Sequence, residues 1–418
     1  MLDAARHISK FLNGGGVMDR SKERLRRSEL AWAIIAFSVG VAALSDKAFS
    51  QACGYEQDLL TCLSATGTSW DGATLVGVTR NADRYFAFRW TQETGRQDIE
   101  FPGGTFARAN GVSADGQVVV GFGNSGNGSP LQAFRWGSLE GIQGLGTLYG
   151  RGSWAMDVSA NGGVVVGYAT NADGTQTRAF RWTLKDGMVD LDTLGGLNAR
   201  AYGVSSDGSV VVGWSSDSSG MPRVFRWTLH DGMQDVGIGG ECYDVSADGS
   251  VLVGAVSGAS AGNSTAFRWS AEQGLELLGT LGGSESVAQG VSADGTTVVG
   301  YSYDAESDWP YAMAWTRSGG MIRLLRAQGP EPESNAYATS CDGSVVVGYN
   351  MIGGGRQTAF RWVRSTADLD RNGLLDSVDH DLFVSVFEAG DLGADINHDG
   401  FVNGDDYDLF AEAFEAGC

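Results

Sequence analysis

Histidine, proline and basic residues are scarce in this chain of 418 residues. The four His disfavour mechanisms that need several imidazoles. The six Pro, together with the lack of a Gly-X-Y period, exclude a collagen-like or Pro-rich disordered chain. Lys and Arg total 29 against 50 Asp and Glu, so the formal net charge is −21. Such a surface repels phosphate groups, and therefore neither nucleic acid nor an anionic membrane surface is an expected partner.

Cysteine is also sparse, because five residues do not make a disulfide-dense scaffold. Cys53 and Cys62 are close enough in sequence to pair in an oxidising compartment. Cys242, Cys341 and Cys418 have no assignable partners, and an odd count leaves at least one thiol unpaired within the chain.

Glycine and aromatic residues are abundant. The 63 Gly make up about 15% of the chain, roughly twice the usual share. The hydrophobic fraction of 42%, with 12 Trp and 18 Phe, provides ample material for burial and excludes global disorder.

Residues 1–52 are typical of an export signal. A basic stretch at residues 20–27 precedes an uncharged run at residues 31–44. Fourteen residues are short for a membrane span, which needs about 20, but they fit the hydrophobic region of a signal peptide. Small residues offer cleavage after Ser50 or Ala52. We therefore expect a secreted or cell-surface protein with no membrane segment after cleavage; the alternative is a retained N-terminal anchor.

Residues 53–366 contain seven copies of a repeat. One marker, of the VSADG-VVVG type, begins at Ser69, Val112, Val158, Val204, Val245, Val291 and Thr339. The other, of the AFRW type, ends at Trp90, Trp136, Trp182, Trp227, Trp269, Trp315 and Trp362. The two alternate strictly, and successive Trp are 46, 46, 45, 42, 46 and 47 residues apart.

Each copy is expected to form four short strands, with a tight turn at Asp-Gly or Asn-Gly between the first two. Four strands in roughly 40–50 residues are typical of a β-propeller blade, whereas the alternative, a β-solenoid, uses shorter repeats. The last copy lacks a fourth strand, and Tyr55–Leu60 resembles one. One strand, six quartets and a final three give twenty-eight strands. The sequence thus predicts an all-β seven-bladed β-propeller in which the N-terminal strand closes the last blade.

This pattern resembles the HAF-repeat family of extracellular bacterial proteins over about Leu63–Arg364, through the AFRW-type motif. The resemblance implies an extracellular repeat protein and assigns no activity. The Asp-Gly turn also looks like the Asp-box of sialidase propellers, but Gly follows Asp immediately in VSADG, so the match fails.

An Arg precedes the marker Trp in six copies, and Ala314 replaces it in the sixth. These Arg could form a ring that binds anionic ligands, or each could make a structural bond, for example to the turn Asp. We favour the structural role, because one binding site breaks repeat symmetry, and we likewise expect the marker Trp to pack between blades. Aromatic residues outside the marker are candidates for stacking on sugars or for rim packing: Tyr149, Trp154, Trp214, Trp309 and Tyr311.

Residues 367–418 form an acidic module with two copies of a metal-ligand pattern. Fourteen acidic residues and one Arg lie in residues 368–418. Oxygen side chains stand at positions 1, 3, 5, 9 and 12 of each loop, Gly stands at position 6, and position 7 offers a backbone carbonyl, which is the set that Ca²⁺ requires. The sequence therefore predicts two Ca²⁺ ions held by Asp368, Asp370, Asn372, Leu374, Asp376 and Asp379, and by Asp395, Asn397, Asp399, Phe401, Asn403 and Asp406.

A ten-residue segment follows each loop, from Asp381 and from Asp408, and the two are identical at seven positions. Their apolar residues fall on one helical face, so the two helices are expected to pack together. These faces comprise Leu382, Phe383, Val386 and Phe387, matched by Leu409, Phe410, Ala413 and Phe414. The alternative is an acid-rich disordered tail.

The tail resembles a type I dockerin domain, a small α-helical module with paired EF-hand calcium loops that docks onto cohesin modules. The resemblance implies a cohesin-like or cell-surface protein partner. Dockerins commonly use a hydroxyl pair late in the loop, where this chain has Ser377-Val378 and Gly404-Asp405, so only one hydroxyl remains. Asp at position 12 suits millimolar external calcium.

Together these features predict a secreted, monomeric, non-enzymatic binding or scaffold protein. Its propeller would present a surface for a polysaccharide or a protein, and its tail would provide calcium-dependent attachment. Two alternatives stay open: an extracellular carbohydrate-active enzyme on a propeller, either a glycoside hydrolase or a lyase, and a purely structural surface-matrix protein. No acidic pair has a defensible catalytic spacing, and His230 alone makes no triad.

Overall fold

The computed structural model describes residues 54–416, apart from 60–61, 82, 127, 258–262, 307–308, 325–332, 353–355, 373–374 and 397–400. Two compact units are present: one comprises residues 56–363, and the other includes residues 364–418. The expected export signal and Cys53 lie outside the described residues, and with them the expected Cys53–Cys62 pairing. Within the described part of the chain, no helix has the length and apolar character needed to cross a membrane.

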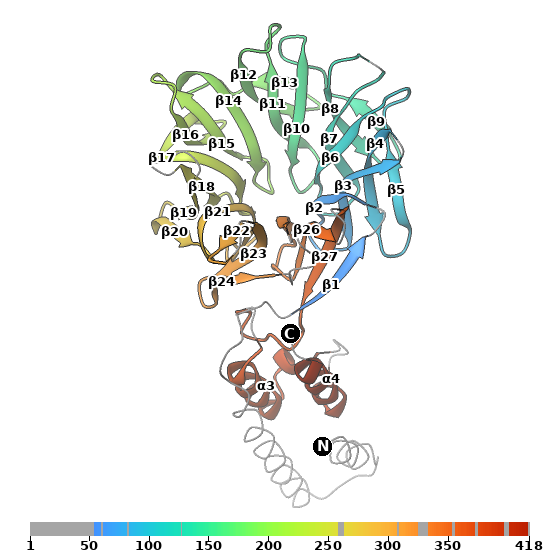
Figure 1. Cartoon of the computed structure of the whole chain (residues 1–418), viewed down its shortest axis with the longest axis vertical. Coiled ribbons are helices and arrows are strands. Elements are labelled where there is room, and N and C mark those ends of the chain that lie inside the picture. The colour runs from blue at the N-terminus through green and yellow to red at the C-terminus, as the bar shows by residue number, and fades with distance from the viewer. Residues whose placement is uncertain are drawn as a thin grey trace, which may run out of the picture. The chain divides into compact units, whose positions relative to one another are not determined.

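The repeat unit consists of antiparallel sheets, which Figure 1 shows arranged one after another around a common centre. Four sheets hold four consecutive strands each. They comprise β2 (Ser64–Thr68), β3 (Thr74–Asn81), β4 (Arg84–Thr91) and β5 (Gly95–Ile99); β6 (Ala107–Val112), β7 (Val118–Gly123), β8 (Gln132–Gly137) and β9 (Gly141–Gly144); β10 (Gly152–Val158), β11 (Val164–Thr170), β12 (Thr177–Thr183) and β13 (Gly187–Asp190); and β21 (Gly282–Val291), β22 (Thr297–Asp304), β23 (Pro310–Thr316) and β24 (Gly320–Arg323).

The fourth and fifth copies share one seven-stranded sheet. It comprises β14 (Gly195–Val204), β15 (Val210–Asp217), β16 (Pro222–Thr228), β17 (Gly232–Val245), β18 (Val251–Ser257), β19 (Ser264–Ser270) and β20 (Gly274–Gly279). The 14-residue strand β17 pairs with β16 and then, beyond Gly237 and Gly240 with their positive φ, with β18. One long strand thus replaces two expected ones, and the described residues contain 27 strands rather than twenty-eight.

The last sheet joins the two ends of the repeat unit. Strands β25 (Ser334–Thr339), β26 (Val345–Ile352) and β27 (Arg356–Arg364) are followed, at the outer edge, by β1 (Gly54–Leu59) in the order β1-β27-β26-β25. Leu59 at the end of β1 is buried in a cluster with Val347 and Ala359 of this sheet and Phe88 of β4.

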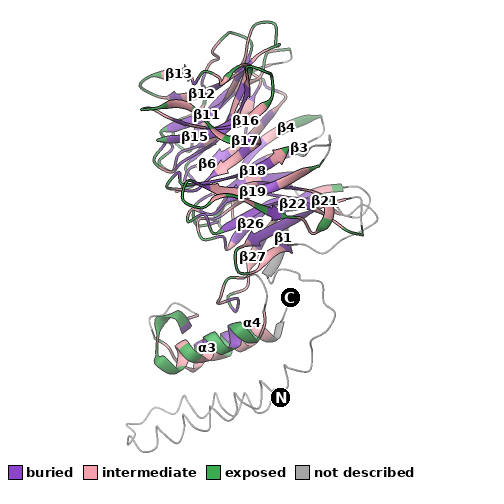
Figure 2. Cartoon of the chain, turned by 90° about the vertical axis from the view of Figure 1, so that its left-hand side faces the viewer, coloured by how far each residue is buried: buried purple, intermediate pink, exposed green. Residues whose placement is uncertain are grey.

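The second and third strands of each sheet form its core, because their apolar residues are buried on both faces, as the purple strands in Figure 2 show. Val165 and Val166 of β11 and Phe180 of β12 have no exposed surface. The buried clusters combine neighbouring sheets: Trp182 packs with Val118 and Leu145 of the preceding sheet, and Trp227 packs with Val164 and Leu191. These clusters confirm that the marker Trp pack between sheets, where their area makes a large hydrophobic contribution.

Each tight turn is held by its own Ser and Asp, with Asn161 in place of Asp in the third copy. In the first copy the Ser69 hydroxyl donates to Asp71 and accepts from the Thr74 amide at 2.9 Å, while Asp71 accepts from the Ala73 amide. Gly72 has φ +68°, and a Cβ there would lie 2.5 Å from Val345 in the last copy. Glycine is therefore required at this position for two reasons: the positive φ of its backbone and the close approach of another sheet.

Backbone hydrogen bonds link the seven turns into a cycle. In each turn, the N–H before the Asp or Asn donates to the carbonyl of the equivalent residue in the next copy, at 2.9–3.1 Å. The last copy returns to the first, because the Cys341 amide donates to the Trp70 carbonyl at 2.9 Å. The seven donors are Trp70, Ala114, Ala160, Ser206, Ala247, Ala293 and Cys341; we call them the turn ring.

The repeated Arg side chains also link neighbouring copies, but not through the turn Asp suggested by the sequence. Arg89 Nε donates to the Gly116 carbonyl at 2.7 Å, in the turn of the next copy. Arg361 of the last copy reaches the Gly72 carbonyl at 3.4 Å. Equivalent bonds are made by Arg135, Arg181 and Arg268. The carbonyl is the partner because each turn Asp already bonds to its own Ser and to a backbone amide, as Asp115 does.

The acidic unit contains α3 (Ser377–Ala389), the short 3-10 helix η1 (Leu392–Ala394) and α4 (Gly404–Ala416). The Phe383 and Phe410 rings stack at 3.9 Å with an interplanar angle of 3°. Val386, Phe387, Ala413 and Phe414 pack around them, as expected. Leu382 and Leu409 do not: both are exposed, and His380 and Tyr407, three residues before the central Phe, lie on the core side instead. The helical period places i−3 on the same side as Phe383 and Phe410, whereas i−1 points away.

Candidate functional sites in the channel and the acidic loops

The first strands of the copies surround a cavity of about 380 Å³, which we call the channel pocket. Its lining comes from β2, β6, β10, β14, β17, β21 and β25, and includes Thr66, Arg108, Asn110, Met156, Asp157, Tyr202, Glu241, Tyr243, Asp244, Gln289 and Tyr337. A smaller cavity of about 140 Å³ is lined by the turn ring. Asp157 and Asp244 line both cavities, so these carboxylates lie between them.

The channel pocket is where the copies differ most in chemistry. The position two residues before the turn Ser is Gly in four copies, but it is Asp157 in the third, Asp244 in the fifth and Ala338 in the last. The preceding residue faces the pocket and is Thr66, Asn110, Met156, Tyr202, Tyr243, Gln289 or Tyr337. These departures from repeat symmetry single out the pocket as the candidate ligand site.

Asp157 and Asp244 each connect two copies. Asp157 accepts from the Val158 amide at 2.7 Å and from the Val204 amide of the next copy at 2.9 Å. Asp244 accepts in the same way from Val245 and Val291. Burial raises the pKa of Asp157 to about 6. Burial, with the charge of Asp157, raises the pKa of Asp244 to about 8.

Two half-buried Arg lie at or next to the pocket: Arg108 lines it, and Arg200 contacts the lining residue Tyr202. The Arg108 guanidinium hydrogen-bonds to Tyr337, and that of Arg200 to Tyr202. Arg200 also lies over the rings of Tyr168 and Trp214, at 4.7 and 5.7 Å from their centroids. The Nε atoms of both Arg are buried and have no hydrogen-bond partner among the described residues.

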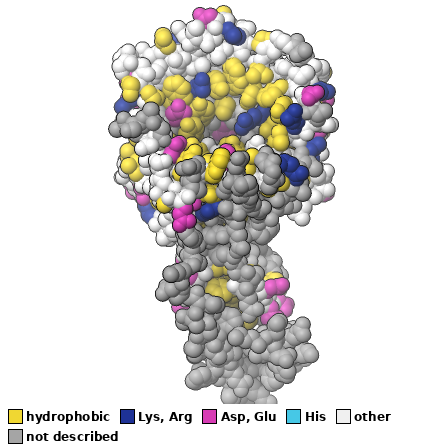
Figure 3. All heavy atoms as spheres, viewed as in Figure 1, with side chains coloured by type: hydrophobic (Ala, Val, Ile, Leu, Met, Phe, Trp, Pro, Cys, Tyr) yellow, Lys and Arg dark blue, Asp and Glu magenta, His cyan; other side chains and the backbone are white. Residues whose placement is uncertain are grey.

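A row of aromatic contacts continues from these Arg. Trp154 stacks on Tyr168 at 5.0 Å, and Phe122 contacts Trp154 at 6.3 Å. Phe106 in turn contacts Phe122 and Tyr85. Figure 3 shows hydrophobic side chains gathered in a band across one face of the repeat unit, with Lys and Arg side chains along it.

Carboxylates accept from Tyr hydroxyls in the later copies. Tyr243 donates to Glu241 at 2.9 Å and Tyr301 donates to Glu285 at 3.1 Å. A third pair joins Tyr349 and Glu333. Burial, with these carboxylates, raises the pKa of Tyr243, Tyr301 and Tyr349. Cationic, aromatic and acidic side chains therefore all lie at or near the pocket, and the charge of Glu241 acts on Arg200.

The five aromatic candidates have different positions. Trp154 lies in β10 and stacks on Tyr168, the ring over which Arg200 lies. Trp214 lies in β15 and contacts Arg200 directly. Tyr311 is buried in β23 with the Arg323 guanidinium 3.4 Å from its ring centroid, so it packs rather than presenting a face. Tyr149 is exposed and its hydroxyl donates to Asp190. Trp309 is half-buried and lies just before β23.

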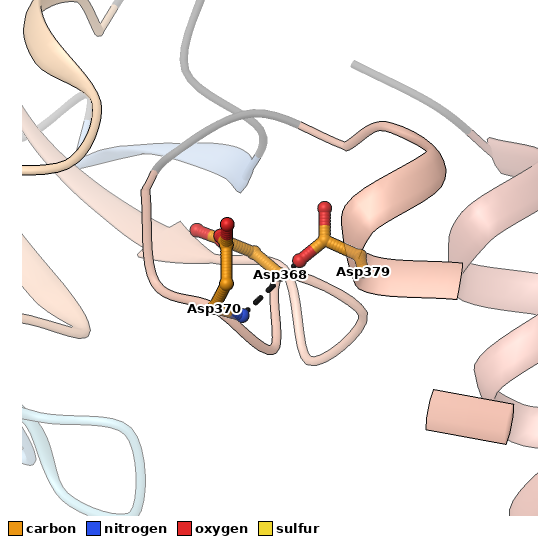
Figure 4. Close-up of side chains that lie close together, drawn as sticks. All are labelled: Asp368, Asp370 and Asp379. Atoms are coloured by element: carbon orange, nitrogen blue, oxygen red, sulfur yellow. Dashed lines mark hydrogen bonds between the residues drawn. The ribbon is translucent and has the colours of Figure 1, made fainter. Parts of the chain in front are cut away.

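The first acidic loop brings three of the predicted ligands together. Figure 4 shows Asp368, Asp370 and Asp379, each of which offers a carboxylate oxygen within 4.8 Å of the other two. Asp379 also accepts from the amides of Leu369, Asp370 and Asp376. Burial, with the charge of Asp370, raises the pKa of Asp379, which is the effect of crowded carboxylates.

The other predicted ligands of this loop have separate partners. The Asn372 side-chain amide donates to Asp370 at 2.9 Å. Asp376 caps α3 by accepting from the Val378 amide at 2.7 Å. Leu374 lies outside the described residues.

The second loop repeats part of this arrangement. Asp406 accepts from the amides of Ile396 and Asn403, as Asp379 does from Leu369 and Asp376. Asn403 accepts from the Asp405 amide at the start of α4. Asp395 is buried and Phe401 exposed. Asn397 and Asp399 lie outside the described residues.

Comparisons with known proteins identify the fold. No protein-family model matches the sequence, and no curated protein sequence matches it. Among solved structures, an oligogalacturonate lyase from Vibrio parahaemolyticus is 12% identical, with a TM-score of 0.50 over 76% of this chain and 98% of that one. The β-propeller domain of the Trilobed protease from Pyrococcus furiosus is 11% identical, with a TM-score of 0.50 over 74% and 95%. TolB from Acinetobacter baumannii is 12% identical, with a TM-score of 0.43 over 70% and 80%. The repeat unit is thus a β-propeller, and at these identities the likeness extends to the fold alone.

The raised pKa of Asp244 predicts a stability that depends on pH. The folded state retains a proton that the unfolded chain, with an ordinary Asp pKa near 4, has already lost. Asp244 therefore reduces stability progressively as the pH rises from 5 to 8. Asp244→Gly installs the residue that four other copies have. Its free energy of unfolding, relative to that of the parent chain, should rise by about 2 kcal/mol or more from pH 5 to pH 8.

Denaturant unfolding of both proteins at pH 5 and pH 8 measures this difference. Asp244→Gly also removes the two hydrogen bonds that Asp244 accepts from backbone N–H groups, and this loss changes the free energy of unfolding equally at both pH values. Only the difference between pH 5 and pH 8 is therefore diagnostic. Asp207→Asn is the control, because the Ser205 hydroxyl lowers the pKa of Asp207 and its ionisation does not change in this range. An equal effect of Asp244→Gly at both pH values would contradict the prediction.

Proposed function

We propose that this protein is a secreted, non-enzymatic binding protein in which a closed seven-bladed propeller holds a ligand in its channel pocket and a calcium-loaded tail attaches it to a partner. The observation that carries the binding function is the loss of repeat symmetry at the channel pocket, while the features repeated in the copies bond or pack within the fold. Repeated Arg and Trp are committed to neighbouring sheets, whereas the pocket positions vary from copy to copy: Gln289 occurs once at its aligned position, and the Arg of Arg108 recurs there only as Arg200.

A closed ring of seven blades is supported by three sets of contacts. The turn ring passes through seven copies and returns from Cys341 to Trp70. Gly72 of the first copy packs against Val345 of the last, and Arg361 bonds to its carbonyl. β1 supplies the fourth strand beside β27. A strand from the N-terminus then holds the end of the ring in place, and the edge of β27 is covered.

A binding role is favoured over catalysis by what the acidic groups in the pocket already do. Asp157 and Asp244 each accept hydrogen bonds from backbone N–H groups at both carboxylate oxygens, so these carboxylates are used to join copies. Glu241 accepts from the Tyr243 hydroxyl. None of the described residues lining the pocket is a His, Ser or Cys.

The tail is proposed to be a dockerin-like module with two Ca²⁺ ions. Ca²⁺ takes six to eight hard oxygen ligands, and three carboxylates converge in the first loop. Asp368, Asp370, Asn372, Leu374, Asp376 and Asp379 would hold one ion, and the equivalent residues from Asp395 to Asp406 would hold the other. The stacked pair Phe383 and Phe410 joins the helices that follow the loops, so loading one loop steadies the other. A cohesin-like or cell-surface protein is the partner proposed for this module.

Calcium binding is tested by isothermal titration of residues 53–418. We expect two ions per chain, with dissociation constants of about 0.1–1 mM, because Asp at position 12 is a shorter ligand than Glu. Asp368→Ala and Asp395→Ala should each remove one site. Asp408→Ala, at an exposed position on α4, is the matched control and should keep both. A chain that takes up no Ca²⁺ at 10 mM would contradict the proposed module.

The binding function is tested by retention of residues 53–418 on immobilised extracellular polysaccharides, with release of reducing ends measured in parallel. Thr66→Trp places a large side chain in the pocket and should abolish retention; Thr94→Trp, in an exposed turn, should leave it intact. Retention that survives Thr66→Trp would exclude the pocket as the site. Turnover of a retained polymer would replace the binding function with an enzymatic one.

A further inference from the structure

We propose that the channel pocket binds a sugar acid, with the ligand carboxylate held by Arg108 and Arg200 and its hydroxyl groups held by Tyr and amide side chains of the pocket. This inference rests on the proposed binding function and names its ligand class. Arg108 of the second copy lines the pocket, and Arg200 of the fourth copy lies next to it, hydrogen-bonded to the lining residue Tyr202.

The two Arg make no salt bridge among the described residues, although the charge of Glu241 acts on Arg200. The protein carries a net charge of −21, yet neither Arg108 nor Arg200 takes part in the ion pairs of the described residues. Each guanidinium has five N–H donors and uses one or more on a Tyr hydroxyl. Their Nε atoms are buried without an acceptor. A ligand carboxylate offers the remaining N–H donors of the two guanidinium groups an acceptor of opposite charge.

Stacking fixes how Arg200 presents its donors. With Tyr168 and Trp214 close to the guanidinium, the cation is held by aromatic groups and its N–H donors stay directed along its own plane. A planar carboxylate matches this edge with two parallel hydrogen bonds, which neither a hydroxyl nor an amide does. Holding Arg200 in advance also lowers the entropy lost on binding.

The remaining lining suits a molecule rich in hydroxyl groups. Tyr202 and Tyr337 offer hydroxyls, Asn110 and Gln289 offer amides, and Gln289 Oε1 is buried without a hydrogen-bond partner among the described residues. Hydroxyl groups donate and accept, so they satisfy both kinds of partner. Glu241, which also lines the pocket, repels a second negative group and favours a ligand with one carboxylate. A cavity of about 380 Å³ matches one or two sugar rings.

The test is calorimetric titration of residues 53–418, with bound calcium, against three monosaccharide pairs. Each pair matches a hexuronate with its neutral hexose: glucuronate with glucose, galacturonate with galactose, and mannuronate with mannose. At least one acid should bind, and its neutral partner should bind about tenfold more weakly or worse, because the charged hydrogen bonds are lost. Arg108→Gln and Arg200→Gln should each weaken the acid about tenfold, and Arg200→Lys should restore only part of the loss because it lacks the planar donor edge.

Arg151→Gln is the matched control: it removes one positive charge from an exposed position near β10 and should leave affinity unchanged. Thermal unfolding checks that each variant is folded. Equal binding of an acid and its neutral hexose would overturn the sugar-acid inference while leaving the binding function standing. Arg-dependent binding of N-acetyl-alanyl-alanine, without binding of any hexuronate, would overturn it in favour of a peptide carboxylate. If none of these ligands binds, the inference is overturned. A failure of the proposed binding function is detected separately, because the protein is then not retained on the immobilised polysaccharides.

Discussion

Seven backbone hydrogen bonds between equivalent turns are the constraint on which the repeat unit depends. Each bond is ordinary, worth about 1 kcal/mol net. Their effect comes from being connected in a cycle, because the Cys341–Trp70 bond fixes the last copy against the first and so limits the space at the centre. The turns that make these bonds are rigid for local reasons, with each Ser and Asp satisfying its own turn and each Gly leaving room for the neighbouring sheet.

A β-propeller packed in this way leaves few positions for function. Side chains at the sheet interfaces are determined by packing, and Trp182 and Phe180 illustrate how little room those positions leave. The first strands are different, because one side chain in two faces the channel and is free to vary. The chain uses that freedom unevenly: it has Arg in the second and fourth copies, Asp in the third and fifth, and Tyr in the fourth, fifth and last. Side chains that differ from copy to copy thus line one pocket within a nearly symmetric scaffold.

The sequence predicts the repeats, the strand pattern and the β-propeller fold well, because the Asp-Gly turn and the Val run are local signals repeated in register. The loop spacing also predicts that Asp368, Asp370 and Asp379 lie close together, and their carboxylates do so. The sequence does not predict the partner of the repeated Arg: Arg89 bonds to Gly116 in the next copy, and only packing of the sheets brings these groups within reach. Likewise, Leu382 is expected in the helix interface because it is apolar, but the helical period places His380 on the side of Phe383 instead.

The channel pocket was overlooked at the level of sequence for an identifiable reason. Loop aromatic residues attract attention as departures from the repeat, whereas Asp157 and Asp244 lie inside the repeat as single changes from Gly. Aligning the seven first strands by their turn Ser would have exposed both, together with Arg108 and Arg200. What no alignment supplies is that residues 47 positions apart bond to one another, as Asp157 does to Val204.

Hydrogen exchange at the seven turn-ring amides tests the closed ring most directly. If the ring is closed, the Cys341 amide opens only with the rest of the repeat unit, and its protection equals that of Ala114 and Ala160 under native conditions. Exchange at Cys341 that is about a hundredfold faster than at Ala114 would mean that the last copy separates from the first, and the closed ring would have to be abandoned.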